Sequence, residues 1–367
     1  MEGSAFAGEG FDAELLPVEE LADCAASVLA GDGKRILSYG SGAGYTPLRE
    51  LIAEWFGVHP RRVLVTNGSL QGLGLLARQL GPGRPVVAEY PVNARMERTL
   101  LDAGAVLTSV EIDSAGLNVG ELAQQLAEYR RPALVYTIPS FHDPTGYTMA
   151  ADRRRSLVEL VRAHNARETD GIVLVEDDAY GLTRFEGERL PALFDLSAKT
   201  SIYSSSFSTT IAPGLRVGWL VLPEGLALRL AEIATATYIT PALLGQATAY
   251  EFIRRGSFEP HLTRLRDSLK LRRDALLDAL AQHFPDSACS RPQGGFFVWL
   301  ELPAGTDSRV FLERAQLNSA VPGTAFASTA NALRLSYAAG SPEELAAGVE
   351  RLAAARAEQA AQVTTMK

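Results

Sequence analysis

The sequence has few cysteines and few lysines, no long hydrophobic run and no excess of positive charge. Its 367 residues include two cysteines, Cys24 and Cys289, which lie far apart and without metal-type spacing. This excludes a disulfide-rich scaffold and fits a reducing compartment. The longest apolar runs, such as V-G-W-L-V-L, have the length of strands, so we expect no membrane span. The net charge of −8 argues against nucleic-acid binding and against an anionic membrane surface.

The composition is that of a globular protein, with 47% hydrophobic and 21% charged residues. The N-terminus, M-E-G-S-A-F-A-G-E-G, is acidic and has no basic segment before an apolar run. We therefore expect no signal peptide and a cytoplasmic location. We also expect no metal site, because the cysteines lack metal-type spacing, and a small-molecule substrate.

Short β-rich runs alternate with helical patterns over the first two thirds of the chain. This alternation predicts parallel strands with right-handed crossovers and so a three-layer α/β/α domain with a mostly parallel sheet. We expect strands at 63–66, 85–89, 105–112, 133–138 and 171–177. Ligands of such sheets gather at the carboxyl ends of the strands.

The pattern changes after residue 223, where several helices precede G-G-F-F-V-W-L and N-A-L-R-L-S-Y. These segments predict a smaller α+β domain at the C-terminus. We expect a large domain over 37–265, a small domain over 266–367, and an N-terminal segment, 1–36, that packs on the small domain.

Two loops have the features of a phosphate site. Gly68-Ser69-Leu70 stands where a strand turns into a helix, so free backbone N–H groups and the helix dipole would point at one place. The stretch S-S-S-F-S-T-T-I-A-P-G-L-R would add the hydroxyl of Ser206 and the positive charge of Arg216. Each loop alone is also typical of an ordinary turn with a helix cap.

Carboxylates and one histidine follow two further strands. Asp177, in E-D-D-A-Y, would place its carboxylate in the crevice, where a protonated ring nitrogen is a suitable partner, or it would cap the next turn. Tyr180 could donate a hydrogen bond to a ring oxygen or simply pack. In P-S-F-H-D-P-T-G, His142 beside Asp143 is a candidate proton shuttle, although most lone histidines are structural.

Taken in order, these motifs resemble the class I and II aminotransferases of pyridoxal-phosphate fold type I, and most closely the aromatic and α-aminoadipate branch. The similarity extends from about Leu37 to Leu352 and includes T-N-G-S-L-Q-G-L, I-P-S-F-H-D-P-T-G, E-D-D-A-Y, S-F-S-T-T-I-A-P-G-L-R-V-G-W and L-R-L-S-Y. It implies a homodimer with shared sites and pyridoxal phosphate as cofactor.

The resemblance also implies a role for each matching residue. The backbone of Ser69 and Leu70, with Ser206 and Arg216, would hold the cofactor phosphate. Asp177 would pair with the pyridine nitrogen and Tyr180 with the ring oxygen. Tyr39 would reach the phosphate in the neighbouring subunit, and Arg334 would bind a substrate α-carboxylate in bidentate fashion.

Three positions depart from the family's pattern. Thr209 stands in S-F-S-T-T where the family has the lysine that bonds to the cofactor and then moves a proton, and threonine can do neither. Asp143 replaces an asparagine, and its charge would repel a phenolate oxygen. Asn93 replaces the tyrosine that stacks on the ring. The four lysines of the chain, Lys34, Lys199, Lys270 and Lys367, offer no credible substitute.

The sequence leaves four interpretations open. The first is an enzyme that binds pyridoxal phosphate, or a preformed cofactor–amino-acid adduct, without a covalent bond, with His142 or Asp143 moving the proton. The second is an enzyme that has abandoned the cofactor for cyclisation, condensation or hydrolysis of an amino-acid-type or carboxylated substrate. The third is a non-catalytic ligand-binding homologue, and the fourth a laboratory replacement of the lysine. The accompanying changes at Asp143 and Asn93 favour natural divergence, and the retained Asp177 favours the first interpretation.

Overall fold

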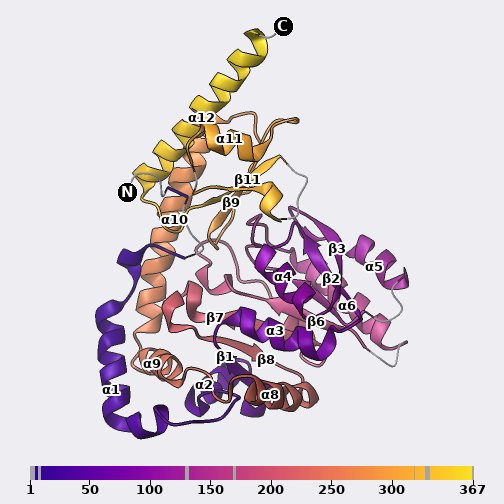
Figure 1. Cartoon of the computed structure of the whole chain (residues 1–367), viewed down its shortest axis with the longest axis vertical. Coiled ribbons are helices and arrows are strands. Elements are labelled where there is room, and N and C mark those ends of the chain that lie inside the picture. Colours follow the sequence, from indigo (N-terminus) through magenta and orange to yellow (C-terminus); the bar gives the residue numbers. More distant parts are fainter. Residues whose placement is uncertain are drawn as a thin grey trace.

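The chain folds around a large mixed sheet and a small antiparallel sheet (Figure 1). The structure, a computed structural model, describes residues 5–6, 10–128, 132–167, 171–317, 319–326 and 331–365, and the side chains of the last range only to residue 358. Within these ranges, no helix is both long and apolar enough to cross a membrane.

The large sheet has eight strands in the order β1-β8-β7-β6-β5-β2-β3-β4 within the described ranges. The strands from β7 through β6, β5 and β2 to β3 run parallel, whereas β8 is antiparallel to both of its neighbours. The predicted mostly parallel sheet is therefore confirmed, and β1 points the same way as β5, β6 and β7. The strands are β1 (Val63–Thr66), β2 (Pro85–Tyr90), β3 (Val106–Asp113), β4 (Gly116–Leu117), β5 (Leu134–Thr137), β6 (Val173–Asp177), β7 (Ser201–Ser206) and β8 (Gly218–Val221).

Helices cover both faces of this sheet, as the alternation along β2 shows. Val86 and Ala88 pack in one hydrophobic cluster and Val87 in another, because successive strand residues point to opposite faces. The first cluster includes α3 (Ser69–Leu80), α4 (Ala94–Asp102) and α8 (Glu224–Tyr238). The second includes α5 (Val119–Glu128), α6 (Ala151–Asn165) and α7 (Leu193–Leu196). The predicted three-layer α/β/α architecture is confirmed.

The small sheet has the order β10-β11-β9, with both pairs antiparallel. The long helix α10 runs from beside α9 up to this sheet, and there α12 packs against α10 (Figure 1). Near the N-terminus, Asp12 pairs with Arg272 of α10, and the following helix α1 lies along α9. These elements are β9 (Phe297–Glu301), β10 (Val321–Pro322), β11 (Ala332–Ser336), α1 (Val18–Ile36), α2 (Thr46–Trp55), α9 (Leu243–Arg254), α10 (Phe258–His283), α11 (Ser308–Arg314) and α12 (Pro342–Thr365).

Short 3₁₀ helices join these elements. Two of them, η4 and η5, form the loop between β7 and β8 and bring it back over the end of the sheet. Those in the described ranges are η1 (Ala13–Leu15), η2 (Pro60–Arg62), η3 (Gly181–Thr183), η4 (Phe207–Thr209), η5 (Pro213–Leu215) and η6 (Gly323–Phe326).

Candidate active site

A cavity of about 360 Å³ opens at the carboxyl ends of β1, β5, β6 and β7. We call it the main cavity. Its position follows the rule for open α/β sheets, in which ligands bind beyond the carboxyl ends of the strands. Its lining includes nine of the residues singled out from the sequence: Ser69, Leu70, Asn93, Asp143, Asp177, Tyr180, Ser206, Thr209 and Arg216.

One wall of the main cavity is formed by the start of α3 and by Arg216. Helix α3 begins after Gly68, whose φ of 92° favours glycine and which supplies no side-chain cap, so the first N–H groups of the helix have no capping side chain. The guanidinium of Arg216 donates to the carbonyl oxygens of Asn67 and Pro213, both at 3.1 Å. A Cβ at Gly68 would lie 2.4 Å from Arg216 Nη2, and a Cβ at Gly218 would lie 2.3 Å from the backbone nitrogen of Ser69. The two glycines therefore allow the start of α3 and the guanidinium of Arg216 to lie close together. Helix N–H groups beside a positive charge form a suitable site for an anion.

Two serines of the β7–β8 loop complete this wall. Ser206 Oγ accepts a hydrogen bond of 3.3 Å from the backbone N–H of Ser208, and both residues line the cavity. This bond caps η4 and holds the loop beside Arg216.

Asp177 ends β6 at the cavity. Tyr136, from the neighbouring strand β5, donates a hydrogen bond of 2.5 Å to Asp177 Oδ2. The other oxygen, Oδ1, is buried and has no hydrogen-bond partner within the described ranges. Burial raises the pKa of Asp177 to about 6, because a desolvated carboxylate is disfavoured, although the hydroxyl groups of Tyr136 and Ser204 act in the opposite direction. An unsatisfied buried oxygen of this kind suits a ligand that brings an N–H donor.

Tyr180 and Thr209 also line the main cavity. The Tyr180 ring packs edge-on against Phe296 and Phe297, and burial raises the pKa of its hydroxyl well above the ordinary value. The Thr209 hydroxyl donates to the carbonyl oxygen of Ala179 at 2.5 Å, and its residue is buried. Thr209 thus has a structural bond within the chain and no amine to offer a ligand.

Asp143 is the centre of a buried polar cluster that we call the Asp143 cluster (Asn93, Asp143 and Arg334). Asp143 Oδ1 accepts a hydrogen bond of 2.8 Å from Arg334 Nη1, and Oδ2 accepts one of 2.8 Å from Asn93 Nδ2. Asn93 also caps α4 through its Oδ1. The guanidinium of Arg334 lies over the rings of Phe297 and Phe326, at 4.3 and 5.0 Å from their centroids. Both oxygens of Asp143 are therefore satisfied within the chain.

His142 faces away from the main cavity and is not among the lining residues. Its Nδ1 lies 3.0 Å from Thr145 Oγ1, and its Nε2 lies 3.5 Å from Glu89 Oε2. Burial lowers the pKa of His142 to about 3 and raises that of Glu89 to about 7, because burial disfavours the charged form of each group. The role of His142 as a proton shuttle stays a prediction, and this placement argues against direct contact with a ligand in the cavity.

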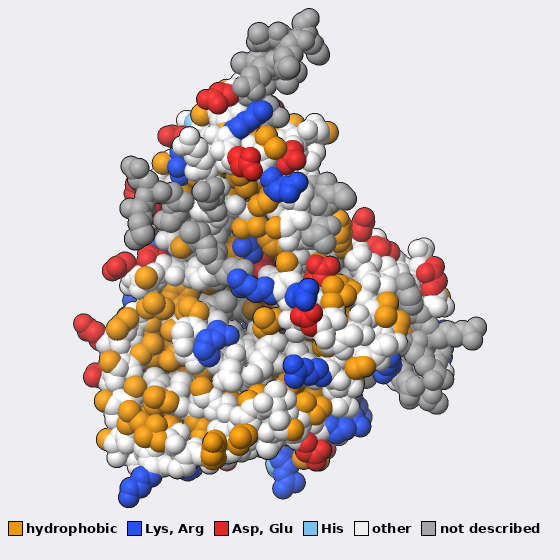
Figure 2. All heavy atoms as spheres, viewed as in Figure 1, with side chains coloured by type: hydrophobic (Ala, Val, Ile, Leu, Met, Phe, Trp, Pro, Cys, Tyr) orange, Lys and Arg blue, Asp and Glu red, His pale blue; other side chains and the backbone are white. Residues whose placement is uncertain are grey.

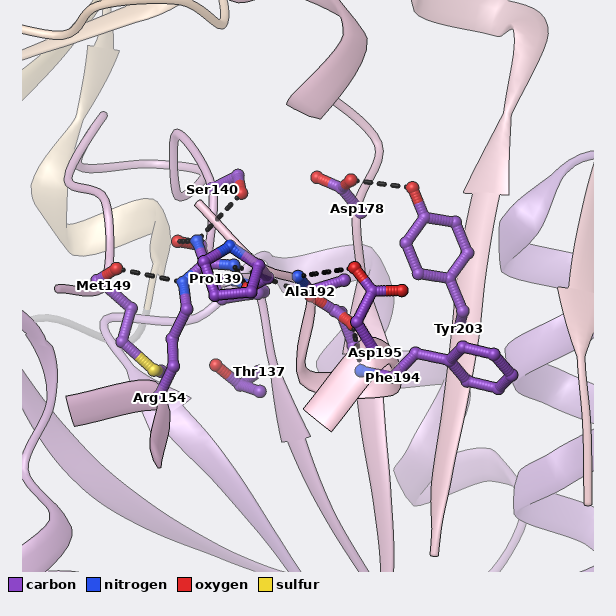
Figure 3. Close-up of polar contacts among 12 residues, drawn as sticks. Thr137, Pro139, Ser140, Met149, Arg154, Asp178, Ala192, Phe194, Asp195 and Tyr203 are labelled. Carbon is purple, nitrogen blue, oxygen red and sulfur yellow. Dashed lines mark hydrogen bonds and ion pairs between the residues drawn. The ribbon is translucent and has the colours of Figure 1, made fainter. Parts of the chain in front are cut away.

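The loop that carries His142 and Asp143 is fixed from behind by the buried Arg154 (Figure 3). Its guanidinium donates to the carbonyl oxygens of Met149 (3.0 Å), Pro139 (2.7 Å) and Pro191 (3.1 Å), and to Ser140 Oγ (3.0 Å). Arg154 thereby ties both ends of the 139–149 loop to α6. Burial lowers its pKa because the charged form is desolvated.

A second cavity, the side cavity, adjoins this arginine and has a volume of about 350 Å³. Its lining includes Asp178 and Tyr203, whose hydroxyl donates to Asp178 Oδ2 at 2.7 Å. Burial raises the pKa of Glu176, in the same lining, to about 8. Asp178, the residue after β6, therefore accepts a hydrogen bond from a tyrosine in the side cavity, as Asp177 does in the main cavity.

The other candidates lie outside the main cavity. Tyr39 is 83% exposed. Of the lysines, Lys270 forms ion pairs with Glu186 and Asp274, neither Lys34 nor Lys199 lines the cavity, and Lys367 falls outside the described ranges. The described residues contain no group of three histidines, cysteines or carboxylates placed to hold a metal ion.

The model of the family described as "Aminotransferase class I and II" matches residues 10–352. The chain belongs to this family. The 2-aminoadipate transaminase of Thermus thermophilus is 37% identical over 360 residues, covering 95% of this chain and 88% of that protein. The aromatic-amino-acid aminotransferase 1 of Thermococcus litoralis is 31% identical, covering 93% and 84%.

A solved structure supports the same assignment. The α-aminoadipate aminotransferase of Thermus thermophilus, complexed with N-(5'-phosphopyridoxyl)-L-leucine, superimposes with a TM-score of 0.91 at 34% identity. The match covers 98% of this chain and 93% of that one. The resemblance inferred from the motifs, and with it the fold type I class, is confirmed.

Sequence reasoning missed several residues of this aminotransferase-type site. Tyr136, Arg95 and Met96 line the main cavity, and Glu89 and Arg154 support it from behind. Tyr136 stands in the predicted strand 133–138, one position before Thr137, and alternation along that strand could have placed it on the face of the cavity. Arg154 carried no such signal, because A-D-R-R-R reads as an exposed basic helix start.

Proposed function

We propose that this chain binds pyridoxal phosphate, or a preformed adduct of it with an amine, without a covalent bond. In this proposal it is an aminotransferase-like enzyme that does not use the lysine-based reaction. The observation that carries the proposal is Asp177, whose residue lines the main cavity and whose buried Oδ1 has no hydrogen-bond partner among the described residues. A buried carboxylate oxygen without a partner costs stability.

The residues present fit two parts of the cofactor. The start of α3 at Ser69, together with Ser206 and Arg216, would hold the phosphate through backbone N–H groups, hydroxyls and a fixed positive charge. Asp177 would accept the pyridine N–H and keep that nitrogen protonated. When bound, pyridoxal phosphate supplies an electron sink for an amine substrate.

The residues at the remaining part of the cavity differ from those of a lysine-dependent enzyme. Thr209 has its hydroxyl bonded to Ala179 and forms no covalent bond to a cofactor. Asp143 is the carboxylate that lines the cavity beside Tyr180, and it is our candidate for holding and moving a proton. A carboxylate so placed also discourages an anionic ring oxygen.

This last observation favours a second candidate function. If Asp143 excludes the ring of pyridoxal phosphate, the main cavity would instead bind another anionic small molecule, held by Arg216 and the start of α3. Such a protein would act without a cofactor or would bind its ligand without catalysis.

We also propose a homodimer. Figure 2 shows hydrophobic side chains gathered over the region of α1, α2 and α9. Exposed apolar residues on or beside these helices include Leu29, Leu37 and Tyr39, at 39%, 73% and 83% exposure. Light scattering on a size-exclusion column tests this: a monomeric mass at micromolar concentration contradicts it.

The experiment that tests the cofactor proposal is a titration of the purified protein with pyridoxal phosphate, followed by calorimetry and absorbance. We expect saturable binding without the absorbance of a protein-bound imine, and loss of that binding in Arg216→Ala. No binding at millimolar cofactor contradicts the proposal and favours the second candidate, for which carboxylated and phosphorylated metabolites are the next ligands to titrate.

The substitution Thr209→Lys sharpens this test. In an otherwise intact pocket, the new amine should bond to the cofactor, turn the protein yellow, and leave a covalent label after borohydride reduction, detectable by mass spectrometry. Thr210→Lys, one position along, is the matched control and should not label. A Thr209→Lys protein that folds but never labels counts against a preserved pocket.

A further inference from the structure

The Asp143 cluster changes what the main cavity presents to a substrate. Arg334 has no place among the residues that line the cavity, whereas Asp143 and Asn93 both line it. The guanidinium lies behind the carboxylate, bonded to it at 2.8 Å and covered by the rings of Phe297 and Phe326. The cavity wall therefore presents a carboxylate in front of its arginine.

This arrangement opposes the binding of a carboxylate group at the same place. A ligand carboxylate that reached Arg334 would have to displace Asp143 or lie directly beside it. Displacement would leave a buried charge with one hydrogen bond, from Asn93, and close approach would place two like charges in a poorly solvated site. Either course weakens binding.

The same wall favours a neutral or cationic group. Asp143 is held in place by two donors from different elements, Asn93 at the start of α4 and Arg334 in β11, so it is fixed before any ligand arrives. A hydrogen-bond donor or an ammonium group on the ligand gains from a fixed carboxylate, whereas an anion does not.

We infer that this cavity selects an amine that has no carboxylate on the carbon next to its nitrogen. The inference rests on the proposed function and narrows its substrate class from amino acids to simple amines. Asp143 is the residue that sets this specificity, and Arg334 holds Asp143 in position.

Calorimetry with two matched adducts tests the inference. N-(5'-phosphopyridoxyl)-L-leucine and N-(5'-phosphopyridoxyl)-3-methylbutylamine differ only in the carboxylate. We expect the protein to bind the amine adduct about tenfold tighter than the leucine adduct. In Asp143→Asn, the amide removes the charge and exposes a cationic Arg334, so the preference should shift toward the leucine adduct by at least about tenfold.

Asp102→Asn removes a carboxylate from an exposed pair with Arg98 and should keep the original preference. Equal or tighter binding of the leucine adduct by the unsubstituted protein overturns the inference alone, whether or not Asp143→Asn folds. Failure of both adducts and of pyridoxal phosphate to bind overturns the proposed function, and this inference with it.

Discussion

Two groups of polar side chains meet in the main cavity, and they differ in whether the chain itself satisfies them. On one side, Asp177 Oδ1 has no hydrogen-bond partner in the part of the chain that the structure describes, and Arg216 lies beside the start of α3, which has no side-chain cap. On the other side, both oxygens of Asp143 accept hydrogen bonds, one from Asn93 and one from Arg334. The first group therefore has hydrogen-bonding capacity to spare, whereas the atoms of the second group bond to one another, apart from Arg334 Nε, for which the described residues offer no partner.

We take this difference to reflect one part of a site that is retained and another that has changed. The first group keeps the residue types that the family resemblance assigns to the cofactor phosphate and ring nitrogen. In the second group Asn93 and Asp143 depart from the family's pattern, and both hydrogen-bond within the chain together with Arg334, which matches it. We call the first group (Asp177 and Arg216) the open group and the second (Asn93, Asp143 and Arg334) the closed group. Substitutions in each group, and in the residues that support it, test whether this difference matters for ligand binding.

The largest effect is expected from Arg154→Met, which removes the anchor of the loop that carries Asp143. The Met149 and Pro191 carbonyls and Ser140 Oγ would lose their arginine donor, whereas the Pro139 carbonyl would keep the N–H of Met149. Because unsatisfied buried groups are costly and the guanidinium is lost, we expect the free energy of unfolding to fall by about 4 kcal/mol. Urea denaturation measures the change. Arg155→Met, at the exposed neighbouring position, is the control and should change stability by less than about 0.5 kcal/mol. Equal effects of the two variants contradict the anchoring role.

How much of this the sequence could predict depends on the distance between partners along the chain. Ser69, Asp177 and Ser206 follow the ends of strands, and the pattern of short apolar runs was enough to bring them to one edge of the sheet. The bond between Arg334 and Asp143 joins residues 191 positions apart, and no local pattern encodes it. The direction of β8 was also invisible, because alternation along a strand is the same for parallel and antiparallel pairing.

Arg154 illustrates a second limit. Three consecutive arginines, 153 to 155, lie near the start of helix α6, and only the middle one is buried. Helical spacing predicts the helix, but the choice of the buried arginine depends on where the 139–149 loop packs. A local sequence pattern therefore predicts the residues of the open group, such as Asp177, more readily than Arg154 and Arg334, which hold Asp143 in place.

Removal of the charge in the open group should abolish most cofactor affinity. Arg216→Met keeps much of the aliphatic stem, deletes the guanidinium and leaves the start of α3 intact. We expect the dissociation constant of pyridoxal phosphate to rise about 100-fold, or about 2.7 kcal/mol, because bonds to charged groups are among the stronger ones. Arg98→Met, in an exposed helix pair, is the control for calorimetry. A change below threefold in Arg216→Met means that the phosphate binds elsewhere.

Replacing the buried carboxylate of Asp177 with a neutral amide should stabilise the ligand-free protein, by an amount that depends on pH. The pKa of Asp177 is about 6 in the fold and 3.8 ordinarily, so the native state binds the extra proton. Its contribution to stability is full below pH 4 and is lost as the pH rises through about 6. Asp177→Asn does not titrate, so its stability should not fall in this pH range. The amide NH₂ of the new side chain can take the position of Oδ1.

We therefore expect Asp177→Asn without ligand to be more stable than the original chain at pH 7.5, by on the order of 2 kcal/mol, with the difference shrinking toward pH 4.5. Urea midpoints at the two pH values measure this. The same variant should bind pyridoxal phosphate more weakly, since the ring nitrogen loses its charged partner. A variant that is less stable at pH 7.5 shows that Asp177 has a structural role we have not recognised.

The smallest effect is expected from Tyr136→Phe, which leaves Asp177 in place and removes the hydrogen bond that supports its charged form. Because that bond lowers the pKa of Asp177 against the effect of burial, its loss should raise the pKa further and weaken cofactor binding by about fivefold, or about 1 kcal/mol. Tyr203→Phe removes the equivalent bond to Asp178 in the side cavity, and it should leave cofactor affinity unchanged. If both substitutions weaken binding equally, their effect is a general loosening of the sheet. If only Tyr136→Phe does so, the ionised Asp177 is what the ligand requires, and the open group of the cavity is functional.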